Sequence, residues 1–233
     1  MCTIAAVAAG GVVTAGAPAF AATPTGFTAG DLVIYQANGD TSTSYSVSLV
    51  DYSTTGVASG FSVDLPSSNG GGNYELTESG SASFDGELSL SGDGQSLLAT
   101  GYTAGPGVTK ITSATNTPRT VAIVSSSGSV DTTTSLSDAT TEGNNFRSAV
   151  TAVGGGTIWV GGGGGVGVTT DGGSSATYLN SDNVHDVQVV GSQLYESTAT
   201  AINAVGSGLP ASGSPSDTTL VGGTNAPSGF EPA

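Results

Sequence analysis

The chain has 233 residues, of which 38 are glycine and only 9% are charged, and its formal net charge at pH 7 is -15. Its three basic residues, Lys110, Arg119 and Arg147, are too few to neutralise a nucleic-acid backbone or to attract an anionic membrane surface. The length suits one large β domain, and the 36% of apolar residues fall in short patterned runs, which favours a folded chain over a disordered one.

The first 21 residues resemble a secretory signal peptide. Residues 4–13 are apolar but too few to span a bilayer, and residues 19–21 (AFA) form a small-x-small cleavage site. No Lys or Arg precedes the apolar run, so an apolar N-terminal strand is the alternative. Cleavage would remove Cys2, the only cysteine. The sequence therefore predicts a secreted, extracellular or cell-envelope protein, with one domain over 22–233 and no membrane span.

Alternation of apolar and polar residues is the main signal along the rest of the chain. Val47 and Leu49 share one face of their run, as do Phe61, Val63 and Leu65, and as do Phe84, Leu88 and Leu90. A period of two predicts strands that are buried on one side. Turn pairs such as Asp93-Gly94 and Asp171-Gly172 separate the runs and predict antiparallel hairpins.

The predicted strands form one group of three and three groups of four, which predicts an all-β, β-propeller-like array of four-stranded antiparallel blades. Because the first group lacks a strand and the last is followed by a Pro- and Gly-rich tail, we expect an incomplete or open propeller of about 4 blades. Open blade faces also predict self-association. The groups are 31–35, 44–52 and 60–65; 84–90, 96–102, 119–124 and 129–136; 145–153, 157–161, 166–170 and 176–179; and 184–190, 193–196, 201–205 and 218–221.

Five consecutive glycines, 161–165, raise the question of a phosphate-binding loop. Gly162, Gly164 and Gly167 satisfy a loose G-x-G-x-x-G pattern, but the following "VTTDGG" does not predict the helix that a dinucleotide site needs. A phosphate loop would also need a lysine that the segment lacks. The run is therefore interpreted as a strand end and its turn.

Two segments resemble a known group of proteins. The strand–turn–strand "LSLSGDGQSLLATGY" (88–102), and "GNNFRSAV" (143–150) followed by "GGGTIWVGGGGGVGV" (154–168), are similar to uncharacterised secreted bacterial β-propeller-like proteins. The resemblance begins near Asp31 and implies an architecture rather than an activity. Members of that group are longer, so it also implies the N-terminal part of a propeller.

Asn144, Asn145 and Arg147 are the candidate ligand-binding residues. Arg147 begins a predicted inner strand, where a cation could meet an anionic or sugar ligand. The alternative is that its guanidinium binds loop carbonyls or pairs with an acidic residue. Replacing Arg147 with Ala is predicted to leave the fold largely intact and to weaken binding.

Catalytic and metal-binding patterns are weak. His185 and Asp186 are adjacent, but neighbours on a strand point to opposite faces, and one histidine without a mature cysteine does not make a zinc site. The pairs Glu75/Glu78 and Asp85/Glu87 could serve glycoside hydrolysis, and "NSDN" (180–183) and "NGD" (38–40) offer oxygen ligands. Turn formation accounts for both Asn-containing segments, so no catalytic residue, metal or cofactor is predicted.

Three functions remain open from the sequence. The first is a secreted, non-catalytic scaffold that presents loops to a protein or glycan partner. The second is an extracellular hydrolase or lyase that acts on polysaccharide with carboxylates near a channel mouth. The third is a truncated fragment without an independent function.

Overall fold

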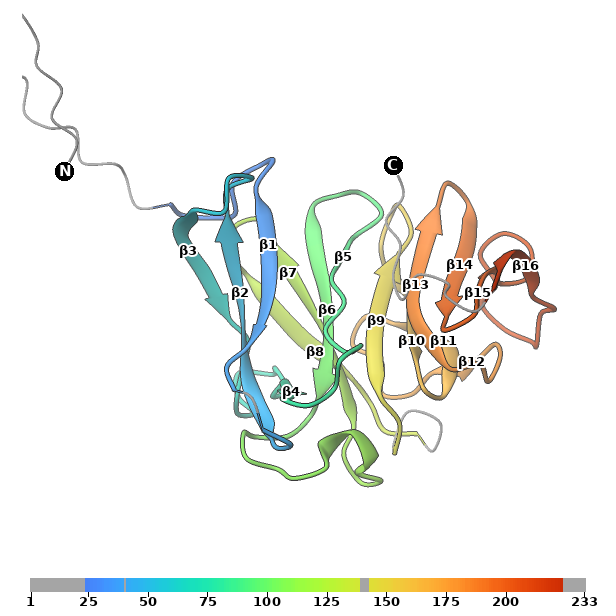
Figure 1. Cartoon of the computed structure of the whole chain (residues 1–233), viewed down its shortest axis with the longest axis horizontal. Coiled ribbons are helices and arrows are strands. Elements are labelled where there is room, and N and C mark those ends of the chain that lie inside the picture. The colour runs from blue at the N-terminus through green and yellow to red at the C-terminus, as the bar shows by residue number, and fades with distance from the viewer. Residues whose placement is uncertain (1–23, 40, 139–142, 224–233) are drawn as a thin grey trace, which may run out of the picture.

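The computed structural model describes residues 24–39, 41–138 and 143–223, and over these residues the protein consists of antiparallel β-strands (Figure 1). The predicted all-β class is confirmed. The described part contains one short 3-10 helix, η1 (Ile111–Ser113), and no helix that is long and apolar enough to cross a membrane. Three features of the sequence analysis lie outside the described residues. They are the predicted signal peptide, which includes Cys2; Asp40 of the "NGD" segment; and the C-terminal tail.

Two of the predicted groups are separate four-stranded sheets. The first has the order β12-β11-β10-β9 and the second the order β13-β14-β15-β16. In both, strands that follow one another in the chain pair as antiparallel neighbours. Short turns join most of these pairs, and the longer segment 205–217 joins β15 to β16. The strands are β9 (Phe146–Thr151), β10 (Thr157–Gly162), β11 (Gly165–Thr170), β12 (Thr177–Tyr178), β13 (Val184–Val190), β14 (Gln193–Thr198), β15 (Ala201–Ala204) and β16 (Thr218–Gly222).

The first two predicted groups are joined in one eight-stranded sheet, which the sequence did not predict. The connecting strand is β4, which pairs with β2 on one side and with β6 on the other. Along β2, the register with β3 ends at Ser48, and residues Ser44, Tyr45 and Ser46 pair with β4 instead. The strands are β1 (Leu32–Ala37), β2 (Ser44–Tyr52), β3 (Ala58–Asp64), β4 (Thr77–Ser79), β5 (Ser89–Leu90), β6 (Ser96–Tyr102), β7 (Arg119–Ser125) and β8 (Val130–Leu136).

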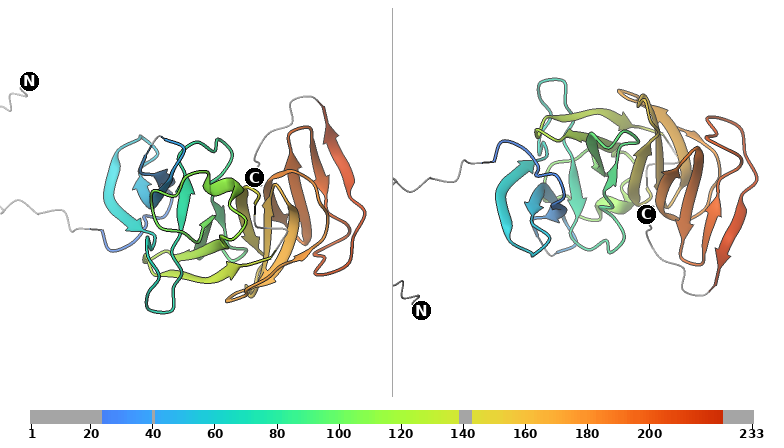
Figure 2. Two further views of the ribbon diagram at one scale, coloured as in Figure 1. Left: turned by 90° about the horizontal axis from the view of Figure 1, so that it is seen from below. Right: turned by 90° about the horizontal axis from the view of Figure 1, so that it is seen from above.

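The core consists of apolar layers between successive groups of strands, which follow one another in chain order along the long axis of the molecule (Figures 1 and 2). The β1–β3 strands enclose one layer with β6 and β7, and a second layer lies between β6–β8 and β9–β10. The third layer lies between the β9–β12 and β13–β16 sheets. The β9–β12 sheet and strands β6 and β7 of the eight-stranded sheet therefore contribute residues to two layers each. Representative residues of the three layers are Val47, Leu49 and Val124; Leu98, Phe146 and Ile158; and Trp159, Val187 and Leu194.

The glycine run is a hairpin turn, as predicted. β10 ends and β11 begins within it, and Gly162 pairs with Gly165. Gly165 has a φ of 113°, and a Cβ on Gly162 would lie 2.2 Å from the backbone carbonyl oxygen of Asn145. Glycine is therefore required here by backbone conformation and by the close approach of a neighbouring segment.

The predicted strand 84–90 is largely wrong, since only Ser89–Leu90 forms β5. Gly86 has a φ of 86°, which interrupts the extended backbone. As a result Phe84 and Leu90 do not share a buried face with Leu88, and they are 43% and 58% exposed. The interruption instead buries the side chain of Asp85 completely.

Candidate functional site

Arg147, the predicted ligand-binding cation, lies on β9 and is only 7% exposed. Its Nε lies 3.5 Å from Oδ1 of the fully buried Asp85, and its Nη1 donates to Oδ1 of Asn183 at 2.7 Å and to the carbonyl of Val184 at 2.6 Å. The guanidinium of Arg147 therefore joins the segment before β5, through Asp85, to the turn that precedes β13. Pairing with an acidic residue was the alternative interpretation of Arg147 from the sequence.

Asn144 and Asn145 lie next to Arg147 but contact different groups. The Nδ2 of Asn145 donates to both oxygens of Asp85, at 2.9 and 3.1 Å. The backbone carbonyl of Asn144 accepts hydrogen bonds from Arg119. The structure thus brings Asn145 and Arg147 together on one carboxylate, and ligand binding by the three predicted residues stays a prediction.

A second buried carboxyl group, Glu78 of β4, extends this network. Tyr35 donates from its hydroxyl to Oε2 of Glu78 at 3.1 Å, and Tyr102 donates to Oδ2 of Asp85 at 2.6 Å. Burial raises the pKa of Glu78 well above its ordinary value, and the charge of Asp85 raises that pKa further. Burial also raises the pKa of Asp85, although its Tyr102, Asn145 and Arg147 partners act in the opposite direction. Of the two carboxyl groups, only Asp85 has an arginine within ion-pair distance.

Arg119, which the sequence analysis did not select, is fully buried at the start of β7. Its guanidinium donates to the backbone carbonyls of Thr112, Ala114, Thr117 and Asn144 and lies 4.7 Å from the ring centroid of Tyr102. Arg119 therefore holds the loop around η1 in place. Binding of loop carbonyls is one of the two structural roles that the sequence analysis considered for Arg147, and here Arg119 has it.

His185 lies on β13 and is 6% exposed, and its ring stacks on that of Phe84 at a centroid distance of 4.6 Å. Burial, followed by the charge of Arg147, lowers the pKa of His185. Its Nδ1 is buried and has no hydrogen-bond partner in the described part of the chain. A catalytic histidine needs an orienting acceptor at this nitrogen, so the environment of His185 is that of a packed core residue.

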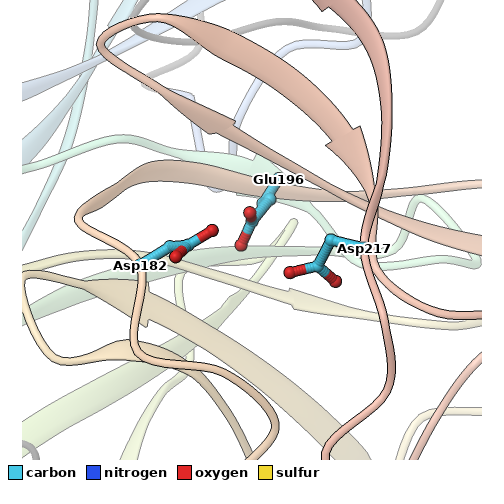
Figure 3. A group of neighbouring side chains, drawn as sticks. All are labelled: Asp182, Glu196 and Asp217. Carbon is cyan, nitrogen blue, oxygen red and sulfur yellow. The ribbon is translucent and has the colours of Figure 1, made fainter.

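Three carboxylates converge beside the β13–β16 sheet (Figure 3). Asp182 precedes β13, Glu196 lies on β14 and Asp217 immediately precedes β16. One oxygen from each lies within 4.8 Å of the others, and we call these three residues the acidic cluster. Glu196 is fully buried, Asp217 is partly buried and Asp182 is exposed. No Lys or Arg among the described residues forms an ion pair with the cluster, although all three basic residues of the chain are described.

Two asparagine side chains donate hydrogen bonds to the acidic cluster. The Nδ2 of Asn180 donates to Glu196 at 2.9 Å and to Asp217 at 3.0 Å, and the Nδ2 of Asn203 donates to Glu196 at 2.9 Å. Burial raises the pKa of Glu196 to about 7, the two amide donors lower it, and the charges of Asp217 and Asp182 raise it. Oδ1 of Asp217 and Oδ1 of Asn203 are buried without a hydrogen-bond partner in the part of the chain that the structure describes. One unused acceptor therefore belongs to the cluster and a second belongs to an asparagine bonded to it.

An open pocket of about 350 Å³ adjoins the acidic cluster. It lies between the turn before β13, the β14–β15 turn and β16, and its lining is rich in amide and hydroxyl groups. The lining residues are Asp182, Asn183, Thr198, Ala199, Thr200, Ala201, Asn203 and Thr219. Asn183 is the residue that accepts the hydrogen bond from Arg147.

Sequence reasoning identified one part of this region and missed the rest. The segment 180–183 was noted for its oxygen ligands, and it does supply Asn180 and Asp182. Glu196 and Asp217 were missed because each is an isolated acid in its own run, and only strand pairing brings them together. Comparison of the chain with family models finds no match, and neither does comparison with curated proteins.

Proposed function

We propose that the protein is a secreted, non-catalytic, β-propeller-like module that binds a glycan in the pocket beside the β13–β16 sheet. The stacking of successive four-stranded groups, with apolar residues buried between them, supports the propeller-like part of the proposal. The described residues close neither a barrel nor a ring. Blade number and closure therefore belong to the proposal.

The polar pocket carries the proposal of glycan binding. Its side chains are two amides, three threonine hydroxyls and one carboxylate, which can donate to and accept from sugar hydroxyl groups. The pocket contains no large apolar side chain, so an apolar ligand would gain little from entering it. The three basic residues are not among its lining, which disfavours a phosphorylated ligand.

Arg147 contributes to this pocket through Asn183. Its Nη1 holds the Asn183 side-chain oxygen at 2.7 Å, which leaves the Asn183 amide NH₂ to donate to a ligand. In this proposal Arg147 is a positioning residue. That role differs from the direct contact with ligand that the sequence suggested.

A polysaccharide hydrolase is the alternative with a specific observation in its favour, because the pKa of Glu196 is raised to about 7 beside other carboxylates. The position of Glu196 argues against it. Glu196 is fully buried, both of its oxygens accept amide hydrogen bonds, and it is not among the residues that line the pocket.

A glycan array probed with the purified full chain tests the proposed function. Thr200→Trp would fill the pocket from the β14–β15 turn, and Thr54→Trp on the exposed β2–β3 turn is the matched control. We expect the wild type and the control to bind the same glycans and Thr200→Trp to lose that binding. No release of reducing ends is expected from any bound polysaccharide. Binding that survives Thr200→Trp would contradict the assignment of the pocket.

Self-association and secretion stay predictions of the same proposal. Leu220 and Val221 on β16 are 56% and 54% exposed, and Leu32 and Ile34 on β1 are 52% and 45% exposed, so apolar side chains lie at both ends of the molecule. We expect light scattering to detect association of copies of the chain, and a strict monomer at all concentrations would contradict it. Intact-mass measurement of exported protein is expected to show loss of about 21 residues.

A further inference from the structure

We propose that the acidic cluster, Asp182, Glu196 and Asp217, binds one divalent cation of the calcium type. The site adjoins the proposed glycan pocket, with which it shares Asp182, but the argument for the cation does not rest on glycan binding. Its ligands would come from three separate segments of the β13–β16 sheet, and their carboxylates point toward one another in Figure 3.

The geometry of the acidic cluster fits a shared ion. Calcium binds oxygen ligands at roughly 2.3–2.6 Å, so two ligands on opposite sides of one ion lie about 4.8 Å apart and other pairs lie closer. The cluster oxygens all lie within 4.8 Å of one another. A single ion can therefore reach all three carboxylates without rearrangement of the backbone.

Charge is the second argument for a cation. Glu196 is fully buried with two carboxylates nearby, and its partners, Asn180 and Asn203, are neutral. A buried carboxylate is costly unless a positive charge compensates it, and the chain places no Lys or Arg in an ion pair with the cluster among its described residues. A bound divalent cation would supply the missing charge.

An unused acceptor on a residue outside the cluster is a further observation. Asn203 is 6% exposed, its Nδ2 donates to Glu196 of the cluster, and its Oδ1 is buried without a hydrogen-bond partner among the described residues. Within the cluster, Oδ1 of Asp217 is in the same situation. Because buried polar atoms are normally satisfied, these two oxygens support a missing positive group here.

The ligand chemistry selects the class of ion. All candidate ligands are oxygens, which suit hard cations and not zinc or copper, because the cluster contains no His or Cys. Calcium takes 6–8 oxygen ligands, and water can complete its shell because Asp182 is exposed and lines the open pocket. Magnesium demands a stricter octahedral arrangement and is expected to bind less tightly.

Isothermal titration of chelator-treated full chain with CaCl₂ tests the site, with MgCl₂ in parallel. We expect one calcium ion per chain with a Kd of about 10⁻⁴ M or tighter and at least about tenfold weaker binding of magnesium. Asp217→Asn removes one ligand charge and is expected to weaken calcium binding at least about tenfold. Asp64→Asn, an exposed carboxylate on β3, is the matched control and should bind as the wild type does.

A thermal melt of the wild type in calcium and in chelator keeps the test independent of how well the variant folds. Calcium is expected to raise the Tm. The proposal would be overturned by the absence of both a one-site isotherm and a Tm increase. It would also be overturned by several weakly bound ions per chain that Asp217→Asn does not affect, since that result indicates diffuse attraction to a chain of charge -15. Glycan binding and calcium binding are measured in separate experiments, so a negative result in one does not decide the other.

Discussion

Two regions of this molecule bury carboxylates, and they balance the charge in different ways. In the network around β6, β7 and β9, Asp85 is buried against Arg147, and Arg119 lies close by on the ring of Tyr102. In the acidic cluster, Glu196 is buried with only asparagine amides as partners. The chain has three basic residues, and both arginines lie in the first region. The first region therefore supplies its own cation to Asp85, whereas in the second region a cation would have to come from outside the chain, as proposed above.

Arg119→Ala should produce the largest effect on the internally balanced region. Four backbone carbonyls would lose a charged donor and a fully buried side chain would leave a cavity, so we expect a loss of about 3–5 kcal/mol in the free energy of unfolding. Urea unfolding followed by circular dichroism measures this loss. Lys110→Asn is the control, because Lys110 is exposed with a φ of 55° that Asn tolerates. A loss below about 1 kcal/mol for Arg119→Ala would contradict the assigned role.

Arg147→Ala should also destabilise the fold, which differs from the expectation from sequence. The substitution would leave Asp85 fully buried without its cation, at a cost of about 3 kcal/mol. Adding Asp85→Asn in the same chain should recover part of that loss, because the uncompensated charge is then removed. Urea unfolding of both single variants and the double variant gives the coupling. Additive losses would show that the two side chains are not coupled.

The pH dependence of stability should be smaller and should trace to the two buried carboxyl groups with raised pKa values, Glu78 and Glu196. An unfolded glutamate ionises near pH 4.3, whereas folded Glu78 keeps its proton to higher pH, so unfolding releases a proton between these values. Stability is therefore greatest below the unfolded pKa and falls as the pH rises through the folded pKa. We expect the free energy of unfolding, measured in chelator, to fall as the pH rises above about 5. Glu78→Gln should reduce the fall, and an unchanged slope would assign it to other groups.

Much of the fold could be predicted because short-range patterns determine it. The alternation around Val47 and Leu49 and the glycine turn at 161–165 describe local geometry, and the structure confirms both. β4 could not be predicted, since Thr77–Ser79 contains three polar residues without alternation and forms a strand only because β2 and β6 offer it edges. The predicted strand 84–90 was largely wrong because Gly86 adopts a positive φ, which the alternation of apolar and polar residues does not reveal.

The candidate sites were harder to predict because they depend on contacts between distant segments. Arg147 was selected for its rarity, but four strands, β5 to β8, separate it in the sequence from its partner Asp85. The acidic cluster had a single local signal in 180–183, and Glu196 and Asp217 look like solvated strand and loop residues in the sequence. Only the pairing of β14 with β13 and β15, and of β15 with β16, brings these carboxylates together.

Hydrogen exchange of the full chain in calcium and in chelator tests most directly whether the two regions differ in their need for an external cation. Calcium is expected to slow amide exchange in 180–183, β14 and β16, which carry or adjoin the acidic cluster, and to leave β6, β7 and β9 unchanged. No change in the β13–β16 sheet, or an equal change in the network around Arg119 and Arg147, would contradict the account.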